Sequence, residues 1–142
     1  MRSTETSRSG LKADSKPNIM ADILVIDDQP YMGQLLAEEL AGERHHIRCL
    51  EDADYLMSFL EESRPDVVLL ELYLQGVERW DLLDRIKKYD PSVPVLIVSA
   101  YDNFLRNLHL HRADGFLIKD IHLNNLRQKL SQELTKPLSH RE

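Results

Sequence analysis

Polar side chains follow four short apolar runs of the sequence, and their types are those that could form a cation site. In chain order, Ile23–Ile26 is followed by Asp27 and Asp28, Val67–Leu70 by Glu71, Val95–Val98 by Ser99, and Phe116–Ile118 by Lys119. Carboxylates brought close together repel one another unless a cation neutralises them, and their oxygen atoms suit Mg²⁺ or Mn²⁺. A lysine opposite them would neutralise further charge. Any one of these carboxylates could instead cap a helix or face solvent, so the site depends on all of them meeting.

Parallel strands would bring these side chains together, because their carboxyl ends lie at one edge of a sheet. A further apolar run, Ile47–Leu50, contains Arg48 and is therefore expected at an edge of that sheet. The runs that precede Asp27, Glu71 and Ser99 are apolar throughout, as is typical of central strands that are buried on both faces.

Stretches of helical period separate these runs. In chain order, the apolar positions of the five stretches are Met32, Leu35, Leu36 and Leu40; Tyr55, Leu56, Phe59 and Leu60; Leu82, Leu83 and Ile86; Phe104, Leu105 and Leu108; and Leu123, Leu126, Leu130 and Leu134. Trp80 is expected to begin the third of these helices. Five strands alternating with five helices predict a flavodoxin-like, doubly wound α/β fold with the strand order 2-1-3-4-5. The stripe of the last helix is expected to face the core, although its spacing would also suit helix pairing.

Composition and charge narrow the class of protein. The chain has 142 residues, 42% of them hydrophobic and 30% charged, and its net charge of −6 argues against direct nucleic-acid binding. No signal-peptide pattern is present, and no apolar run approaches the roughly 18 residues of a membrane span, so a cytoplasmic location off the membrane is expected. The single cysteine, Cys49, cannot form an internal disulfide and is expected to be a small buried residue.

One domain is expected over residues 20–136. Residues 1–19 are almost entirely polar, which predicts a flexible tail, and Met20 could be the natural start with an added extension in front of it. Residues 137–142 are expected to form a second tail. The chain after Lys119 is too short for a DNA-binding or catalytic output domain, so either the output lies in another chain or this sequence is a fragment of a longer protein.

Four segments, taken together, resemble the receiver domain of two-component response regulators. They are Ile23–Asp28, Pro65–Glu71, Val95–Ala100 and Ala113–Lys119, in the order and at the spacing typical of that family. The resemblance covers residues 20 to about 134 and implies the CheY-like version of the predicted fold.

The resemblance also implies roles for individual residues. Asp27 and Asp28 would be the pair that binds Mg²⁺, together with the third-strand carboxylate and the backbone carbonyl of Tyr73. In this family an aspartate at the end of the third strand accepts a phosphoryl group from a histidine kinase. Ser99 and Lys119 would contact that phosphoryl group, and Phe116 would be the aromatic switch residue.

Glu71 occupies the place of the phosphoacceptor aspartate, which changes the expected chemistry. Its extra methylene moves the carboxylate outward by about 1.5 Å, whereas in-line phosphoryl transfer depends on positioning to within about 1 Å. We therefore expect that Glu71 is not phosphorylated. Its carboxylate could imitate part of the phosphorylated charge and hold an active-like state, or it could form an inert ion pair with Lys119.

Other positions also differ from the pattern of the family. Gln75–Arg79 lacks the second glycine that commonly follows the third strand, and the interval from Ser99 to Lys119 is about two residues shorter than usual. Asp120 takes a common cis-proline position, where a trans peptide is expected because a cis bond before a non-proline residue costs about 2.5 to 4 kcal/mol.

These observations predict a signalling domain that is not an enzyme and acts by binding a protein partner, a sensor kinase or a downstream effector. The predicted surface comprises the fourth helix, the fifth strand and the fifth helix, because Phe104, Leu105, Leu108 and Leu110 would lie on more than one face of a helix and leave apolar surface for a partner or a second copy. One alternative is a working Mg²⁺-dependent phosphoacceptor. Another, disfavoured because Asp27 is followed directly by Asp28 and Gln29, is an aspartate-based phosphohydrolase, which usually has a second aspartate two residues after the first.

Overall fold

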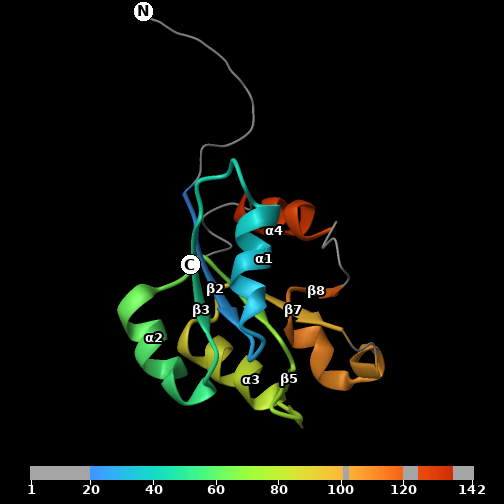
Figure 1. Cartoon of the computed structure of the whole chain (residues 1–142). Helices are drawn as coiled ribbons and strands as arrows, with labels where there is room; N and C mark the ends of the chain where they lie inside the picture. Colours follow the sequence, from blue (N-terminus) through green and yellow to red (C-terminus); the bar gives the residue numbers. More distant parts are fainter. Residues whose placement is uncertain (1–19, 101–102, 120–124, 136–142) are drawn as a thin grey trace, which may run out of the picture.

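A parallel sheet of five strands forms the centre of the protein. The computed structural model describes residues 20–100, 103–119 and 125–135, and the two predicted tails, Asp120 and Leu123 lie outside them. The strands of the sheet, in spatial order, are β3 (His46–Leu50), β2 (Asp22–Ile26), β4 (Val67–Leu70), β7 (Val95–Ser99) and β8 (Gly115–Ile118). This order confirms the predicted doubly wound topology (Figure 1).

Burial along the strands follows their place in the sheet. Every side chain of β4 and β7 is buried, as are four of the five in β2, which confirms these runs as central strands. In β3, by contrast, only Leu50 is buried, which confirms the predicted edge position. Apolar continuity marks central strands because both of their faces are covered.

Two layers of helices cover the sheet and divide the core in two (Figure 1). Helices α1 (Tyr31–Glu39) and α4 (Leu126–Leu134) pack on one face, and α2 (Leu56–Ser63) and α3 (Trp80–Tyr89) pack on the other. The α4 stripe of Leu126, Leu130 and Leu134 is buried in the first of these cores. The stripe therefore faces the core, and Trp80 begins α3 as predicted.

The prediction of a fourth α-helix is wrong. The segment instead forms two short 3-10 turns, η3 (Asn103–Arg106) and η4 (Leu108–Arg112), so the described residues contain four α-helices. Asn107 separates the turns in an extended conformation, and its side chain accepts a hydrogen bond of 2.8 Å from the backbone N–H of His109. Asparagine competes with helical hydrogen bonding in this way.

A hairpin that the sequence analysis did not predict follows β4. Strands β5 (Tyr73–Leu74) and β6 (Val77–Glu78) pair antiparallel around Gln75 and Gly76. Both turn residues have positive φ, 53° and 78°, as the two-residue type I′ turn requires. Glycine adopts this conformation without strain, while Gln75 is held in it by contacts described below.

The expectation that Cys49 is buried is also wrong. The residue is exposed on the edge strand β3. Its thiol lies against α1 at Gly33, where an added Cβ would come within 2.5 Å of the Cys49 Sγ. An edge strand lacks a neighbour on one side, so even a small apolar residue there keeps contact with solvent.

Truncation of the α4 stripe should destabilise the whole fold. Leu130 is 1% exposed, so Leu130→Ala should lower the free energy of unfolding by about 2 to 5 kcal/mol, through lost burial and the cavity left behind. Urea unfolding would measure this change. Gln132→Ala on the exposed side of the same helix is the matched control, with an expected change within about 0.5 kcal/mol. Equal effects would contradict the assignment of the stripe to the core.

Candidate functional site

Three charged side chains meet at the carboxyl edge of the sheet because the strand ladders continue one residue past the strands. The backbone N–H of Asp27 donates to the carbonyl of Leu50 at 3.1 Å, and that of Glu71 donates to Ile26 at 2.9 Å. The backbone N–H of Lys119 donates to the carbonyl of Ser99 at 2.8 Å. Each residue is thereby held in register where its strand ends.

Lys119 bridges the two carboxylates. Its Nζ lies 2.7 Å from Asp27 Oδ2 and 2.9 Å from Glu71 Oε1. The side chain of Lys119 is 11% exposed, that of Asp27 3% and that of Glu71 5%, so both ion pairs are almost fully removed from solvent. Buried charges of this kind are tolerated because they are paired and hydrogen-bonded. Asp27, Glu71 and Lys119 are called the charged cluster below.

The remaining carboxylate oxygens of the site accept hydrogen bonds from nearby backbone. Asp27 Oδ1 accepts from the N–H of Gln29, and Glu71 Oε2 accepts from the N–H of Tyr73, both at 2.9 Å. Asp28 Oδ2 accepts from the N–H of Gln75 at 2.7 Å, which joins the first loop of the domain to the tip of the hairpin.

Burial and pairing oppose each other in the charged cluster. Burial raises the pKa of Asp27 above its usual value, although hydrogen bonds from Lys119 and Gln29 work in the opposite direction. For Lys119, burial alone would lower the pKa, but the hydrogen bonds to Asp27 and Glu71 outweigh it and the pKa is raised. The ammonium is therefore held firmly in its charged form, and Asp27 carries its charge at a cost.

The structure brings only part of the predicted site into direct contact. Ser99 is completely buried at the end of β7. Phe116 is 39% exposed, and its ring packs edge-on against Phe104 with centroids 5.8 Å apart. Asp28 is half-buried and tied to the hairpin, and Tyr73 faces Glu71 through its N–H.

Sequence reasoning missed Gln29 and Gln75, because both contribute backbone N–H groups and not side chains. The Gln75-Gly76 pair resembles the x-Gly turns of two-residue hairpins and could have revealed the second contact.

The donor types suit a hard divalent cation, but their arrangement does not fit one. Carboxylate oxygens are the ligands that Mg²⁺ prefers, at about 2.0 to 2.1 Å. Here Lys119 and backbone N–H groups hold both oxygens of Asp27 and of Glu71 and one oxygen of Asp28. In the ranges that the structure describes, no group of three or more acidic, histidine or cysteine side chains is placed to hold a metal ion.

Comparison with known proteins agrees with the fold and with the segments around the site. Residues 23–131 match the family described as the response regulator receiver domain. The nitrogen assimilation regulatory protein NtrX of Azorhizobium caulinodans is 37% identical over 84 residues, which are 58% of this chain and 18% of that protein. The chain spans well under two thirds of the length of the curated relatives it matches.

Solved receivers have the same architecture. The response regulator TrrA of Thermotoga maritima, crystallised with Mg²⁺ and BeF, superimposes with a TM-score of 0.74 at 26% identity, covering 81% of this chain and all of the other. The receiver domain of NtrX from Brucella abortus gives a TM-score of 0.72 at 32% identity, covering 82% of this chain and all of the other.

The fold and the family match thus define a two-component signalling module, of a class that generally binds Mg²⁺. The chain belongs to the response regulator receiver domain family. Within the described ranges, every helix is too short or too polar to cross a lipid bilayer.

Neutralising Asp27 should stabilise the fold at neutral pH. Its folded pKa lies above the ordinary value of 3.8, so the folded state keeps this proton to higher pH than the unfolded state does. The contribution of Asp27 to stability is therefore lost as the pH rises from the ordinary pKa through the folded one. Asp27→Asn should raise the free energy of unfolding at about pH 7, and the gain should shrink toward about pH 4.

Urea unfolding at both pH values measures this effect. Asp54→Asn, at an exposed carboxylate, is the control and should change little. A less stable Asp27→Asn variant at neutral pH would mean that the ion pair with Lys119 outweighs the cost of burial.

Proposed function

We propose that this receiver domain signals without phosphorylation of Glu71, by binding a protein partner. The observation that carries the proposal is the engagement of both Glu71 oxygens, one by Lys119 at 2.9 Å and the other by the N–H of Tyr73 at 2.9 Å. Glu71 stands where the family resemblance puts the phosphoacceptor aspartate.

The geometry of Glu71 is unsuited to nucleophilic attack. An attacking oxygen must point outward at an incoming phosphoryl group, in line with the leaving group. The Glu71 carboxylate instead forms part of a buried, hydrogen-bonded ion pair and is 5% exposed. To react, it would have to leave both donors, and its longer side chain would place the oxygen about 1.5 Å from the position of an aspartate oxygen.

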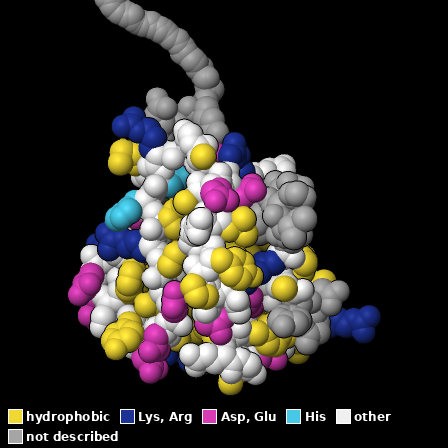
Figure 2. Space-filling view, viewed as in Figure 1, with side chains coloured by type: hydrophobic (Ala, Val, Ile, Leu, Met, Phe, Trp, Pro, Cys, Tyr) yellow, Lys and Arg dark blue, Asp and Glu magenta, His cyan; other side chains and the backbone are white. Residues whose placement is uncertain are grey.

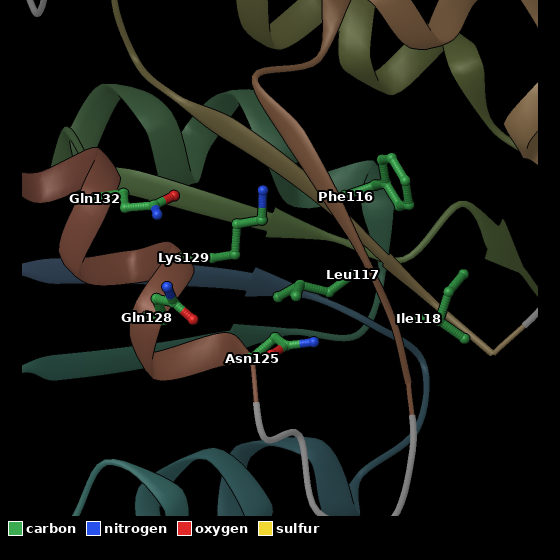
Figure 3. Close-up of a pocket in the computed structure, with 7 residues that line it drawn as sticks. All are labelled: Phe116, Leu117, Ile118, Asn125, Gln128, Lys129 and Gln132. Atoms are coloured by element: carbon green, nitrogen blue, oxygen red, sulfur yellow. The ribbon is translucent and has the colours of Figure 1, made fainter.

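The apolar surface around β8 is the face that we propose binds the partner. Leu108 is 85% exposed, Leu105 42% and Ile118 40%, although Leu110 packs against the core. Between β8 and α4 lies a cavity of about 550 Å³ (Figure 3). Its walls are Phe116, Leu117, Ile118, Asn125, Gln128, Lys129 and Gln132. Exposed apolar side chains next to such a hollow are typical of protein interaction surfaces.

The charge distribution supports a protein partner and not a nucleic acid. Figure 2 shows basic side chains scattered over one face, among acidic and hydrophobic ones, and the whole chain has a net charge of −6. Direct phosphate binding requires clustered basic residues. In this proposal the domain works in the cytoplasm, is not an enzyme, and contacts a sensor kinase, a downstream effector or a second copy of itself.

Intact mass after incubation with a small phosphodonor and Mg²⁺ tests whether Glu71 accepts a phosphoryl group. We expect no gain of mass for the unmodified protein and a single phosphoryl adduct for Glu71→Asp, which restores the shorter nucleophile. A phosphoryl adduct on the unmodified protein, lost in Glu71→Gln, would overturn the proposal. The chain would then be an ordinary phosphoacceptor receiver.

A charge at Leu108 tests the proposed face. Because this side chain is so exposed, Leu108→Glu should leave the free energy of unfolding within about 0.5 kcal/mol. We expect light scattering to show that self-association of the protein, as its concentration is raised, falls in this variant. Val77→Glu is the matched control, since Val77 is 55% exposed on the hairpin. An unmodified protein that stays monomeric would exclude a second copy as the partner.

A further inference from the structure

We propose that Lys119 takes the place of a divalent cation in this domain, so that the site is closed to Mg²⁺, and that Asp28 anchors the hairpin and does not ligate metal. The inference concerns the same site as the proposed function and rests on it, because both depend on the altered environment of Glu71. It goes further by assigning a charge-balancing role to Lys119 and a positioning role to Asp28.

The Lys119 ammonium lies directly between the carboxylates that a bridging cation would contact. Its distances of 2.7 Å to Asp27 and 2.9 Å to Glu71 are those of short, charge-assisted hydrogen bonds. A magnesium ion drawing on these oxygens would have to displace the ammonium or sit beside it. Like charges at such short range repel strongly in a site with so little solvent.

Both carboxylate oxygens of Glu71 take part in this arrangement. While Oε1 holds Lys119, Oε2 accepts the N–H of Tyr73 at 2.9 Å. Glu71 therefore fastens the lysine to the backbone at the start of the hairpin.

Asp28 is bonded to the other end of the same hairpin. Its Oδ2 accepts from the N–H of Gln75 at 2.7 Å, across a sequence separation of 47 residues. Gln75 has a φ of 53°, a left-handed conformation that a non-glycine residue adopts at a cost. The hydrogen bond to Asp28 helps to hold this conformation. Recruitment of Asp28 by a metal would free the N–H of Gln75 and loosen the turn.

Manganese serves as the probe for the closed site, because free Mn²⁺ has an EPR signal that is lost on binding. We expect the unmodified protein to leave the signal unchanged at millimolar concentrations. Removal of the lysine charge in Lys119→Met should create binding at least about tenfold tighter than that of the unmodified protein. Lys88→Met, at an exposed lysine of α3, is the matched control and should behave as the unmodified protein does.

Thermal unfolding and hydrogen exchange test the roles of Lys119 and Asp28 separately. Lys119→Met leaves two buried carboxylates without their partner, so its thermal unfolding midpoint should be low and should rise with added Mn²⁺. Asp28→Asn should increase hydrogen exchange at residues 73–78 without affecting the Mn²⁺ signal, because its role is to hold the hairpin.

Each result supports or overturns the inference. Mn²⁺ binding by the unmodified protein that Asp28→Asn abolishes would overturn it, since Asp28 would then be a ligand. No binding by either the unmodified protein or a folded Lys119→Met variant would show that Lys119 is not what closes the site. Mn²⁺ binding without any phosphoryl adduct on the unmodified protein would overturn this inference alone, whereas a phosphoryl adduct would overturn the proposed function.

Discussion

A single buried ammonium between two buried carboxylates is the interaction on which the rest of this domain depends. Lys119 follows β8, while Glu71 and Asp27 follow β4 and β2, so the lysine reaches past the end of β7 to the ends of β4 and β2. Strand β8 lies two strand spacings, about 10 Å, from β4 and three from β2, so only a long side chain can reach both carboxylates. Burial of these charges costs solvation free energy, and pairing with Lys119 offsets only part of that cost for Asp27 and only while the geometry is kept. The continuous burial of β2, β4 and β7 holds the strand ends rigidly enough to keep it.

The charged cluster and Asp28 together hold the loops around the site. Glu71 and Asp28 each accept a backbone N–H of the β5–β6 segment, so the two acidic residues hold the hairpin at its start and at its tip. Beyond the hairpin, Trp80 hydrogen-bonds Glu78 at 2.6 Å and stacks on His109 of η4. Residues near the charged cluster are in this way connected by contacts to the η3–η4 segment, whose apolar residues form part of the proposed partner surface.

The sequence predicted the parts of this structure that follow from burial and periodicity. The five strands and the edge position of β3 follow from their apolar patterns. The stripe of α4, whose spacing would also suit helix pairing, faces the core as expected. The convergence of Asp27, Glu71 and Lys119 could be predicted because the carboxyl ends of parallel strands meet.

What could not be predicted depended on local hydrogen bonds. Asn107 divides the expected fourth helix through its own side chain, and the turn at Gln75 is held by a residue 47 positions away. Cys49 is exposed because β3 is an edge strand, although its thiol lies against Gly33 of α1.

Because Lys119 already balances the charged cluster, we expect the cluster not to respond to a phosphoryl group or to Mg²⁺. Two-dimensional NMR of the ¹⁵N-labelled protein, with and without Mg²⁺ and beryllium fluoride, would detect such a response. We predict that the backbone amide signals of Asp27, Glu71, Ser99 and Lys119 stay where they are. Saturable shifts of these signals that spread to Phe116 would contradict the account, and would show a site that still binds the phosphoryl analogue and transmits its presence to the partner surface.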